Sequence, residues 1–175
     1  VNWNEKPKAG SKNAQNATNI IAPQAINTPA TGQNSIKLLP NFSIVNASIS
    51  GETTAGGRSR LAALLKLHKP SHVIIELGAN DALRGLPVAA AQSNLNAMTQ
   101  MALQSGAKVL IVGMQIPPNY GQDYTQQFSA VFGNVVKANQ SAKTKTNNAV
   151  ALVPFMLKGV ADSAENIKLF QADRL

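Results

Sequence analysis

The sequence predicts an α/β fold in which a parallel β-sheet is covered on both faces by helices, giving three layers (α/β/α). The first observation is a short, β-branched apolar run at 73–77, which reads Val-Ile-Ile-Glu-Leu. An almost unbroken apolar strand is typical of a parallel sheet buried on both faces. The second observation is that such runs alternate with stretches of helical periodicity, which indicates βαβ units with right-handed crossovers.

The predicted strands are short apolar runs that end in loops containing Gly, Pro or small polar residues. They cover residues 42–46, 72–77, 108–112 and 150–153. Between the first two, a helix from Gly57 places Leu61, Leu64, Leu65 and His68 on one face and ends at Lys69-Pro70. We interpret His68 as a structural histidine at the end of this helix.

Two further helices are predicted. One begins at Pro87 and ends at Gly106, because Pro suits the first turn of a helix and Gly suits the residue after its end. The other connects the strands at 108–112 and 150–153. Its apolar residues recur at helical spacing, and they are Tyr124, Phe128, Val131, Phe132 and Val135.

The composition is that of one ordinary globular domain. The 175 residues are 44% hydrophobic and 14% charged, which excludes a disordered chain. No apolar run is long enough to span a bilayer, so we expect no stable membrane insertion. There is no cysteine, and the two histidines, His68 and His72, have no carboxylates near them at ligand spacing. We therefore expect no metal and no other cofactor.

The basic charge raises an alternative from another functional class. A net charge of +8 and a pI of about 10.0 fit a non-catalytic module that binds an anionic partner. However, the Lys and Arg residues are scattered, and no Asp or Glu occurs between Glu5 and Glu52. We therefore predict no nucleic-acid binding, whereas one contiguous basic face in a map of surface potential would favour the binding module.

The N-terminal part of the chain differs from the rest. Residues 9–37 are mostly small or polar, so we predict a long loop or insertion that packs little. We divide the chain into this N-terminal segment, 1–37, and a domain, 38–175. The chain starts at Val1 without a signal peptide and ends at Leu175 within a predicted loop, so we interpret it as truncated at both ends.

Polar groups follow the predicted strands at the sheet edge where ligands of parallel sheets bind. Gly78-Ala79-Asn80-Asp81 follows the strand at 72–77, and the side-chain amide of Asn80 could donate a hydrogen bond to a developing negative oxygen. Taken alone, this block is better explained as a turn, since Gly, Asn and Asp are common turn residues.

Several blocks together give a more specific signal. Residues 45–53, 78–81, 114–121 and 170–175 resemble, in order and spacing, the SGNH (GDSL-type) serine hydrolases. Within that family they are most similar to the bacterial periplasmic thioesterase/lysophospholipase and arylesterase branch. The resemblance implies the SGNH hydrolase fold, with a flavodoxin-like sheet of order 2-1-3-4-5. It also implies a periplasmic or secreted protein.

The resemblance implies roles for particular residues. Gly51 would donate its backbone N–H and Asn80 its side-chain amide to the oxyanion, so we expect the two to converge at the carboxyl end of the sheet. Asp173 would orient the catalytic histidine. The implied reaction is the hydrolysis of a small acyl ester or thioester through an acyl-enzyme, as in a lysophospholipase or arylesterase. Residues implied to line the acyl pocket are Leu83, Pro117 and Tyr120.

The chain also departs from the family pattern. The family carries its nucleophile in a Gly-Asp-Ser-Leu block after the first strand, and this sequence contains no such block. The family's histidine would follow Leu175. We therefore predict that the first strand, the nucleophile and the histidine are absent and that the chain is inactive. Without the strand, its neighbours would have unpaired edges, so we expect an aggregating or molten chain, or a fragment with no function of its own.

Overall fold

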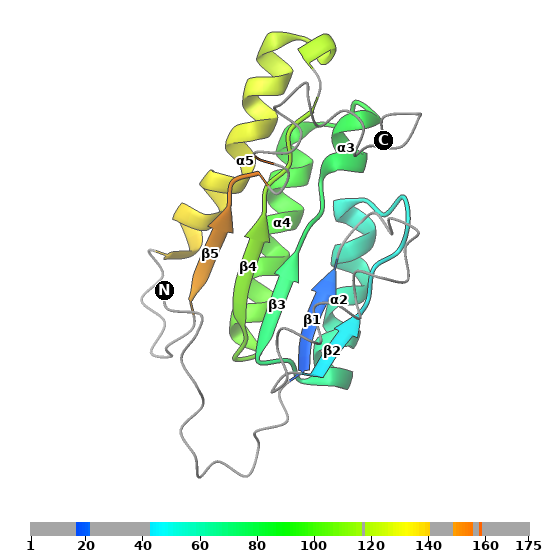
Figure 1. The fold of residues 1–175 in the computed structure, drawn as a ribbon, viewed down its shortest axis with the longest axis vertical. Coiled ribbons are helices and arrows are strands. Elements are labelled where there is room, and N and C mark those ends of the chain that lie inside the picture. The colour runs from blue at the N-terminus through cyan, green and yellow to red at the C-terminus, as the bar shows by residue number, and fades with distance from the viewer. Residues whose placement is uncertain (1–16, 22–42, 117, 141–148, 156–157, 159–175) are drawn as a thin grey trace.

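The computed structural model describes residues 17–21, 43–116, 118–140, 149–155 and 158. These residues form a sheet of five strands in the order β2-β1-β3-β4-β5, and every neighbouring pair is parallel. Figure 1 shows the strands side by side with their carboxyl ends at the same edge. The parallel sheet and its strand order are therefore confirmed. The strands are β1 (Ala17–Ile21), β2 (Ser43–Asn46), β3 (His72–Ile75), β4 (Lys108–Val112) and β5 (Val150–Val153).

Strand β1 occupies the place that the sequence analysis predicted to be empty. Thr18 is paired with Ile44 of β2 on one side and with His72 of β3 on the other. The prediction of an absent first strand is therefore wrong, and β1 lies within the segment that was assigned to 1–37. The run Thr-Asn-Ile-Ile at 18–21 contains three β-branched residues, which favour a strand, although the polar residues around it obscured that signal. The rest of 9–37 lies outside the described residues.

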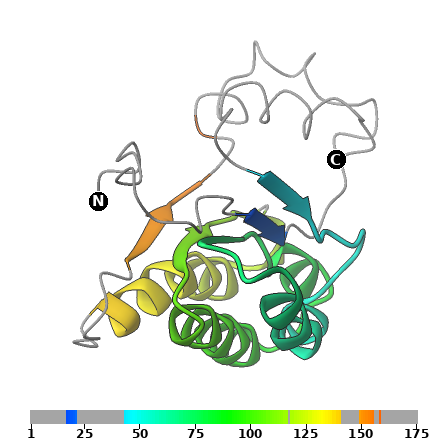
Figure 2. The same cartoon turned by 90° about the horizontal axis from the view of Figure 1, so that it is seen from below.

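Three long helices cover one face of the sheet. They are α2 (Thr54–His68), α4 (Val88–Gln104) and α5 (Gln122–Gln140), and Figure 2 shows all three on the same side. The described part of the chain contains no helix on the opposite face, so the predicted third layer would have to come from the remainder. Two short helices, α3 (Ala79–Leu83) and η1 (Pro118–Tyr120), lie beyond the carboxyl ends of the strands.

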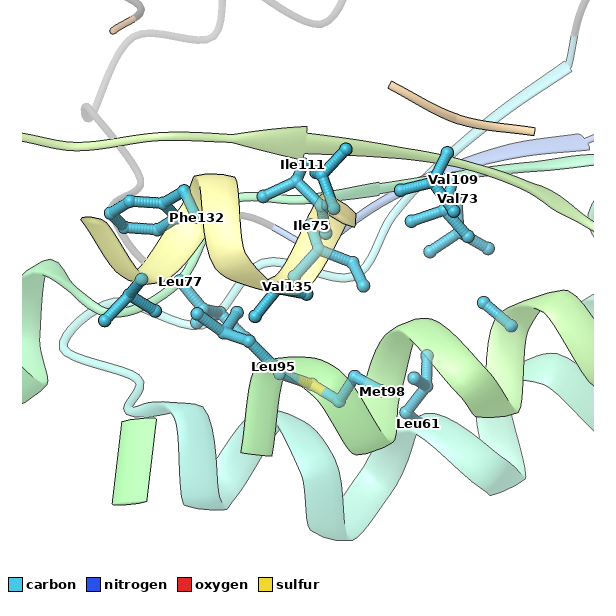
Figure 3. Close-up of a cluster of buried hydrophobic side chains, with 14 of the residues drawn as sticks. Leu61, Val73, Ile75, Leu77, Leu95, Met98, Val109, Ile111, Phe132 and Val135 are labelled. Atoms are coloured by element: carbon cyan, nitrogen blue, oxygen red, sulfur yellow. The ribbon is translucent and has the colours of Figure 1, made fainter. Parts of the chain in front are cut away.

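The core lies between the sheet and these helices. Alternate residues of β3 and β4 point toward the helices and are almost completely buried, among them Val73, Ile75 and Ile111 (Figure 3). Phe128 and Phe132 of α5 pack edge to face, with ring centroids 5.4 Å apart. Both rings lie close to Gly78, which follows the end of β3. The other large side chains of this cluster with almost no exposure are Leu61, Leu77, Leu95, Met98, Val109 and Val131.

The segment after β3 leads to the edge of the sheet at which the candidate site lies. Leu77 remains fully buried beyond the end of the strand, and Gly78 then adopts φ +118°, which favours glycine, and leads into α3. The sequence predicted only a loop here. Gly57 of α2 lies against Leu77, and a Cβ at Gly57 would overlap Leu77 Cδ1, so a larger residue there would force this buried side chain to shift.

Candidate active site

The loop between β2 and α2 meets α3 at the carboxyl edge of the sheet. Asn80 Nδ2 donates a hydrogen bond to the carbonyl oxygen of Glu52 at 3.0 Å. Arg84 Nη2 donates to the carbonyl oxygen of Gly51, also at 3.0 Å. Two consecutive carbonyl groups of the loop are thus held by side chains that lie four positions apart in sequence. The block containing Gly51 therefore lies beside the block containing Asn80.

Gly51 has a left-handed backbone conformation. Its φ is +73°, and among the described residues a Cβ there would meet only Arg84 Nη2, at an ordinary 3.5 Å. Glycine is therefore favoured here by the backbone conformation rather than by lack of space. No hydrogen bond is made by the N–H of Gly51 to any other described residue. Within the described part of the chain, this N–H therefore has no acceptor.

Asp81 joins α3 to the start of α2. Its carboxylate is almost fully buried and accepts hydrogen bonds from the Thr54 backbone N–H at 2.8 Å and from Thr54 Oγ1 at 2.5 Å. Asn94 Nδ2 donates to the same hydroxyl oxygen at 3.1 Å. A carboxylate at the N-terminus of a helix also interacts favourably with the helix dipole. The sequence analysis missed this role, because the pairing is not local in sequence.

A second set of contacts holds the loop between β2 and α2 against α2. Glu52 forms an ion pair with Arg60, with Nε and Oε2 3.1 Å apart. Arg60 Nη1 also donates to the carbonyl oxygen of Ala47 at 2.6 Å. Both ends of the loop that contains Gly51 are therefore tied to one helical side chain. Nothing in the spacing of these residues along the chain indicated this.

Two of the predicted pocket residues lie together. Tyr120 Oη donates to the carbonyl oxygen of Leu83 at 3.4 Å, and each of these residues is 37% exposed. Tyr124 Oη donates to the carbonyl oxygen of Leu86 at 2.8 Å, and this bond ties the chain after α3 to α5. Leu83 and Tyr120 therefore give an exposed apolar surface beside α3. Pro117 and Asp173 lie outside the described residues.

Glu76 is an acidic side chain near this edge with no hydrogen-bond or ion-pair partner among the described residues. It lies between two completely buried residues, Ile75 and Leu77. Burial raises the pKa of its carboxyl group above the ordinary value of 4.5, because the charged form loses hydration. The folded protein therefore binds this proton more tightly than the unfolded chain does.

We expect Glu76→Gln to change how stability depends on pH. Since the folded-state pKa is raised, the wild-type chain should lose stability as pH rises from about 4.5 through the raised pKa, and Gln should remove this loss. The free energy of unfolding in urea should be measured for both chains at a series of pH values. The free energy of unfolding of the variant, relative to that of the wild type, should increase toward neutral pH. A difference that stays constant with pH would contradict this expectation.

The described residues contain no group of three or more His, Asp and Glu side chains that could hold a metal ion. Within the same part of the chain, no helix has the length and apolar character needed to cross a membrane. The predictions of no cofactor and no membrane insertion remain predictions for the protein as a whole.

Comparison with known proteins decides the family. The sequence profile of the GDSL-like lipase/acylhydrolase family matches residues 28–174. The chain belongs to this family. It is 53% identical to Esterase TesA of Pseudomonas aeruginosa over 120 residues, which cover 69% of the chain and 55% of that protein.

More distant relatives carry other activities in their names. The chain is 40% identical to an arylesterase of Vibrio mimicus over 125 residues, 71% of the chain and 58% of that protein. It is 38% identical to thioesterase 1/protease 1/lysophospholipase L1 of Escherichia coli K12 over 118 residues, 67% of the chain and 52% of that protein. In each of these comparisons the match spans little more than half of the relative's length.

Solved structures confirm the predicted fold. The crystal structure of TesA superposes with a TM-score of 0.78 at 40% identity, covering 92% of this chain and 88% of that one. AlinE4, an SGNH-hydrolase family esterase, superposes with a TM-score of 0.74 at 28% identity, covering 94% and 87%. The GDSL-type fold of a parallel sheet flanked by helices is thus shown for this chain.

Proposed function

We propose that this domain serves in a serine hydrolase of carboxylic esters or thioesters, with Gly51 and Asn80 as the oxyanion donors. The observation that carries this proposal is the hydrogen bond from Asn80 Nδ2 to Glu52 O at 3.0 Å, which holds the amide against the loop that contains Gly51. An oxyanion site needs two or more donors that are fixed before the reaction starts. Both donors here come from segments at the same edge of the sheet.

The chemistry follows from that arrangement. When a serine oxygen attacks the carbonyl carbon, the carbonyl oxygen becomes negative, and the Gly51 N–H and the Asn80 amide would donate to it. Losing one such donor costs about 3 to 4 kcal/mol of transition-state stabilisation. Histidine takes the serine proton, and an acid, proposed to be Asp173, holds the imidazole in the required tautomer. The described residues thus supply the electrostatic part of the site.

The proposed substrates are small acyl esters or thioesters, in line with the esterase, arylesterase and thioesterase names of the relatives. The exposed apolar surface of Leu83 and Tyr120 beside Asn80 supports a role in lining the acyl pocket, and Pro117 is proposed as a third lining residue. Periplasmic or secreted localisation is proposed from the family resemblance.

The chain by itself should form no acyl-enzyme. Where the family has Gly-Asp-Ser after its first strand, the residues that follow β1 are Ala22, Pro23 and Gln24. We therefore expect the purified chain to release no stoichiometric burst of nitrophenol from p-nitrophenyl butyrate in a stopped-flow assay. A burst equal to the enzyme concentration would contradict this prediction and would require a different nucleophile.

The donor site itself can be tested without a nucleophile. We expect octanoate, whose carboxylate resembles the reaction product, to shift the NMR signals of the Gly51 N–H and the Asn80 side-chain amide in the isotope-labelled chain. Asn80→Ala should weaken this binding about tenfold, because a hydrogen bond to a charged group is lost. The matched control is Asn134→Ala, which removes an exposed amide of α5 that donates to Gln92 Oε1. Shifts confined to other residues would refute the proposed function.

A further inference from the structure

We infer that Arg84 is a positioning residue for the oxyanion site and that it acts through the carbonyl group of Gly51. The inference rests on the proposed function, because it assigns a role in orienting one of the two proposed donors. Its basis is the hydrogen bond from Arg84 Nη2 to Gly51 O at 3.0 Å. This bond links the candidate site to a side chain that the sequence analysis did not select.

The peptide unit that joins Gly51 to Glu52 is held at both of its ends. Its oxygen accepts from Arg84, and its N–H donates to the carbonyl oxygen of Ile49 at 3.2 Å. The next carbonyl group, that of Glu52, accepts from Asn80. The N–H of Gly51 belongs to the preceding peptide unit, which is joined to the Gly51–Glu52 unit through the Cα of Gly51. The direction of this N–H therefore depends on where the Gly51–Glu52 unit is held and on the φ of +73° at Gly51. Arg84 supplies the side-chain hydrogen bond that holds this peptide unit.

The backbone around Arg84 is itself fixed. The N–H of Arg84 donates to the carbonyl oxygen of Asn80 at 3.2 Å, and the N–H of Leu86 donates to that of Asp81 at 2.9 Å. The guanidinium group therefore extends from a constrained turn, although the side chain itself is exposed. Its planar set of donors fixes a direction that the ammonium group of lysine does not reproduce.

The charge of Arg84 adds to the same effect. No carboxylate forms a salt bridge with Arg84 among the described residues, while the nearby Glu52 is paired with Arg60. A positive group next to one oxyanion donor stabilises negative charge as it develops. If Arg84 instead bound the substrate's anion directly, removing it would weaken binding and leave Gly51 unchanged, so the two roles can be separated.

The experiment compares Arg84→Gln, Arg84→Lys and Arg58→Gln in the full 175-residue chain. Arg58 is an exposed arginine of α2 that donates to Asn94 Oδ1, so its replacement removes the same charge elsewhere. The carbonyl ¹³C and amide ¹⁵N signals of Gly51 are recorded without ligand, and octanoate is then titrated. We expect Arg84→Gln to move both Gly51 signals and to weaken octanoate binding about tenfold. Lysine should restore part of each effect, and Arg58→Gln should cause neither.

Two outcomes would overturn the inference. Gly51 signals that stay in place in Arg84→Gln would exclude positioning, even if the affinity for octanoate fell. Equal changes in Arg84→Gln and Arg58→Gln would show a general effect of charge. The proposed function fails separately, because in that case octanoate would leave the signals of Gly51 and Asn80 unmoved in the wild-type chain. Binding that depends on Asn80 but not on Arg84 would remove only the present inference.

Discussion

Replacing Ile20 with proline should abolish the cooperative unfolding of the chain. Ile20 lies in β1, where it is paired with Asn46 of β2 and with Ile74 of β3, so the strand is internal to the sheet. Proline has no backbone N–H to donate and is excluded from central strands for that reason. A domain of this size is stable by only about 5 to 15 kcal/mol. Losing the strand that connects β2 to β3 should remove a large share of that free energy.

Thermal unfolding followed by near-ultraviolet circular dichroism, together with size-exclusion chromatography, measures this effect. Ile20→Pro should show no sharp transition and should elute as aggregate. The control is Ile20→Val, which keeps the N–H and the β-branched shape and should change stability by less than about 1.5 kcal/mol. A proline variant that melts as the wild type does would show that β1 is dispensable.

Most of the described fold could be predicted because its signals are local. Strands β4 and β5 have the predicted bounds, 108–112 and 150–153, since each is a short apolar run closed by Gly or Pro. In α2, Leu61 and Leu65 are buried as the pattern required, whereas Leu64 and His68, which were predicted on the same face, are half-buried. Where the apolar period is clear, neighbouring residues along the chain contain enough information to place the element.

The elements that were missed depend on distant contacts. Strand β1 is a short run in a polar segment, and it is defined by pairing on both sides with strands far away in sequence. Helix α3 has only five residues, and its side chains and carbonyl groups are held by partners such as Tyr124 and Glu52. Composition predicted a loop in both places, because propensity carries no information about such partners.

The same distinction applies to the candidate site. Gly51 was selected because it stands in a block that resembles a known family, whereas Asn80 was also indicated by its place directly after a buried apolar run. The contact of Arg84 with Gly51 spans 33 residues, and that of Asp81 with Thr54 spans 27. Hydrogen bonds across such separations become visible only in three dimensions. They also determine whether the two proposed donors are held in place.

Replacing Asp81 with alanine should destabilise the chain by about 2 to 4 kcal/mol. Asp81 is 4% exposed and Thr54 is completely buried, so the Thr54 N–H would lose its acceptor with no water to replace it. The Thr54 hydroxyl would lose the same acceptor, although Asn94 still donates to its oxygen. The start of α2 would also lose a favourable negative charge. Asp81→Asn, which keeps one acceptor oxygen, should lose less.

The urea concentration at the midpoint of unfolding measures this loss, provided that the slope of the transition is unchanged. The control is Asp123→Ala, which removes an exposed carboxylate from the first turn of α5 and should cost less than about 1 kcal/mol. Because Asp81 directly follows Asn80, the alanine variant should also shift the NMR signal of the Asn80 amide, whereas the Asp123 variant should not. Equal midpoints for the two alanine variants would show that Asp81 does not hold α3 to α2, and the site would then need another source of rigidity.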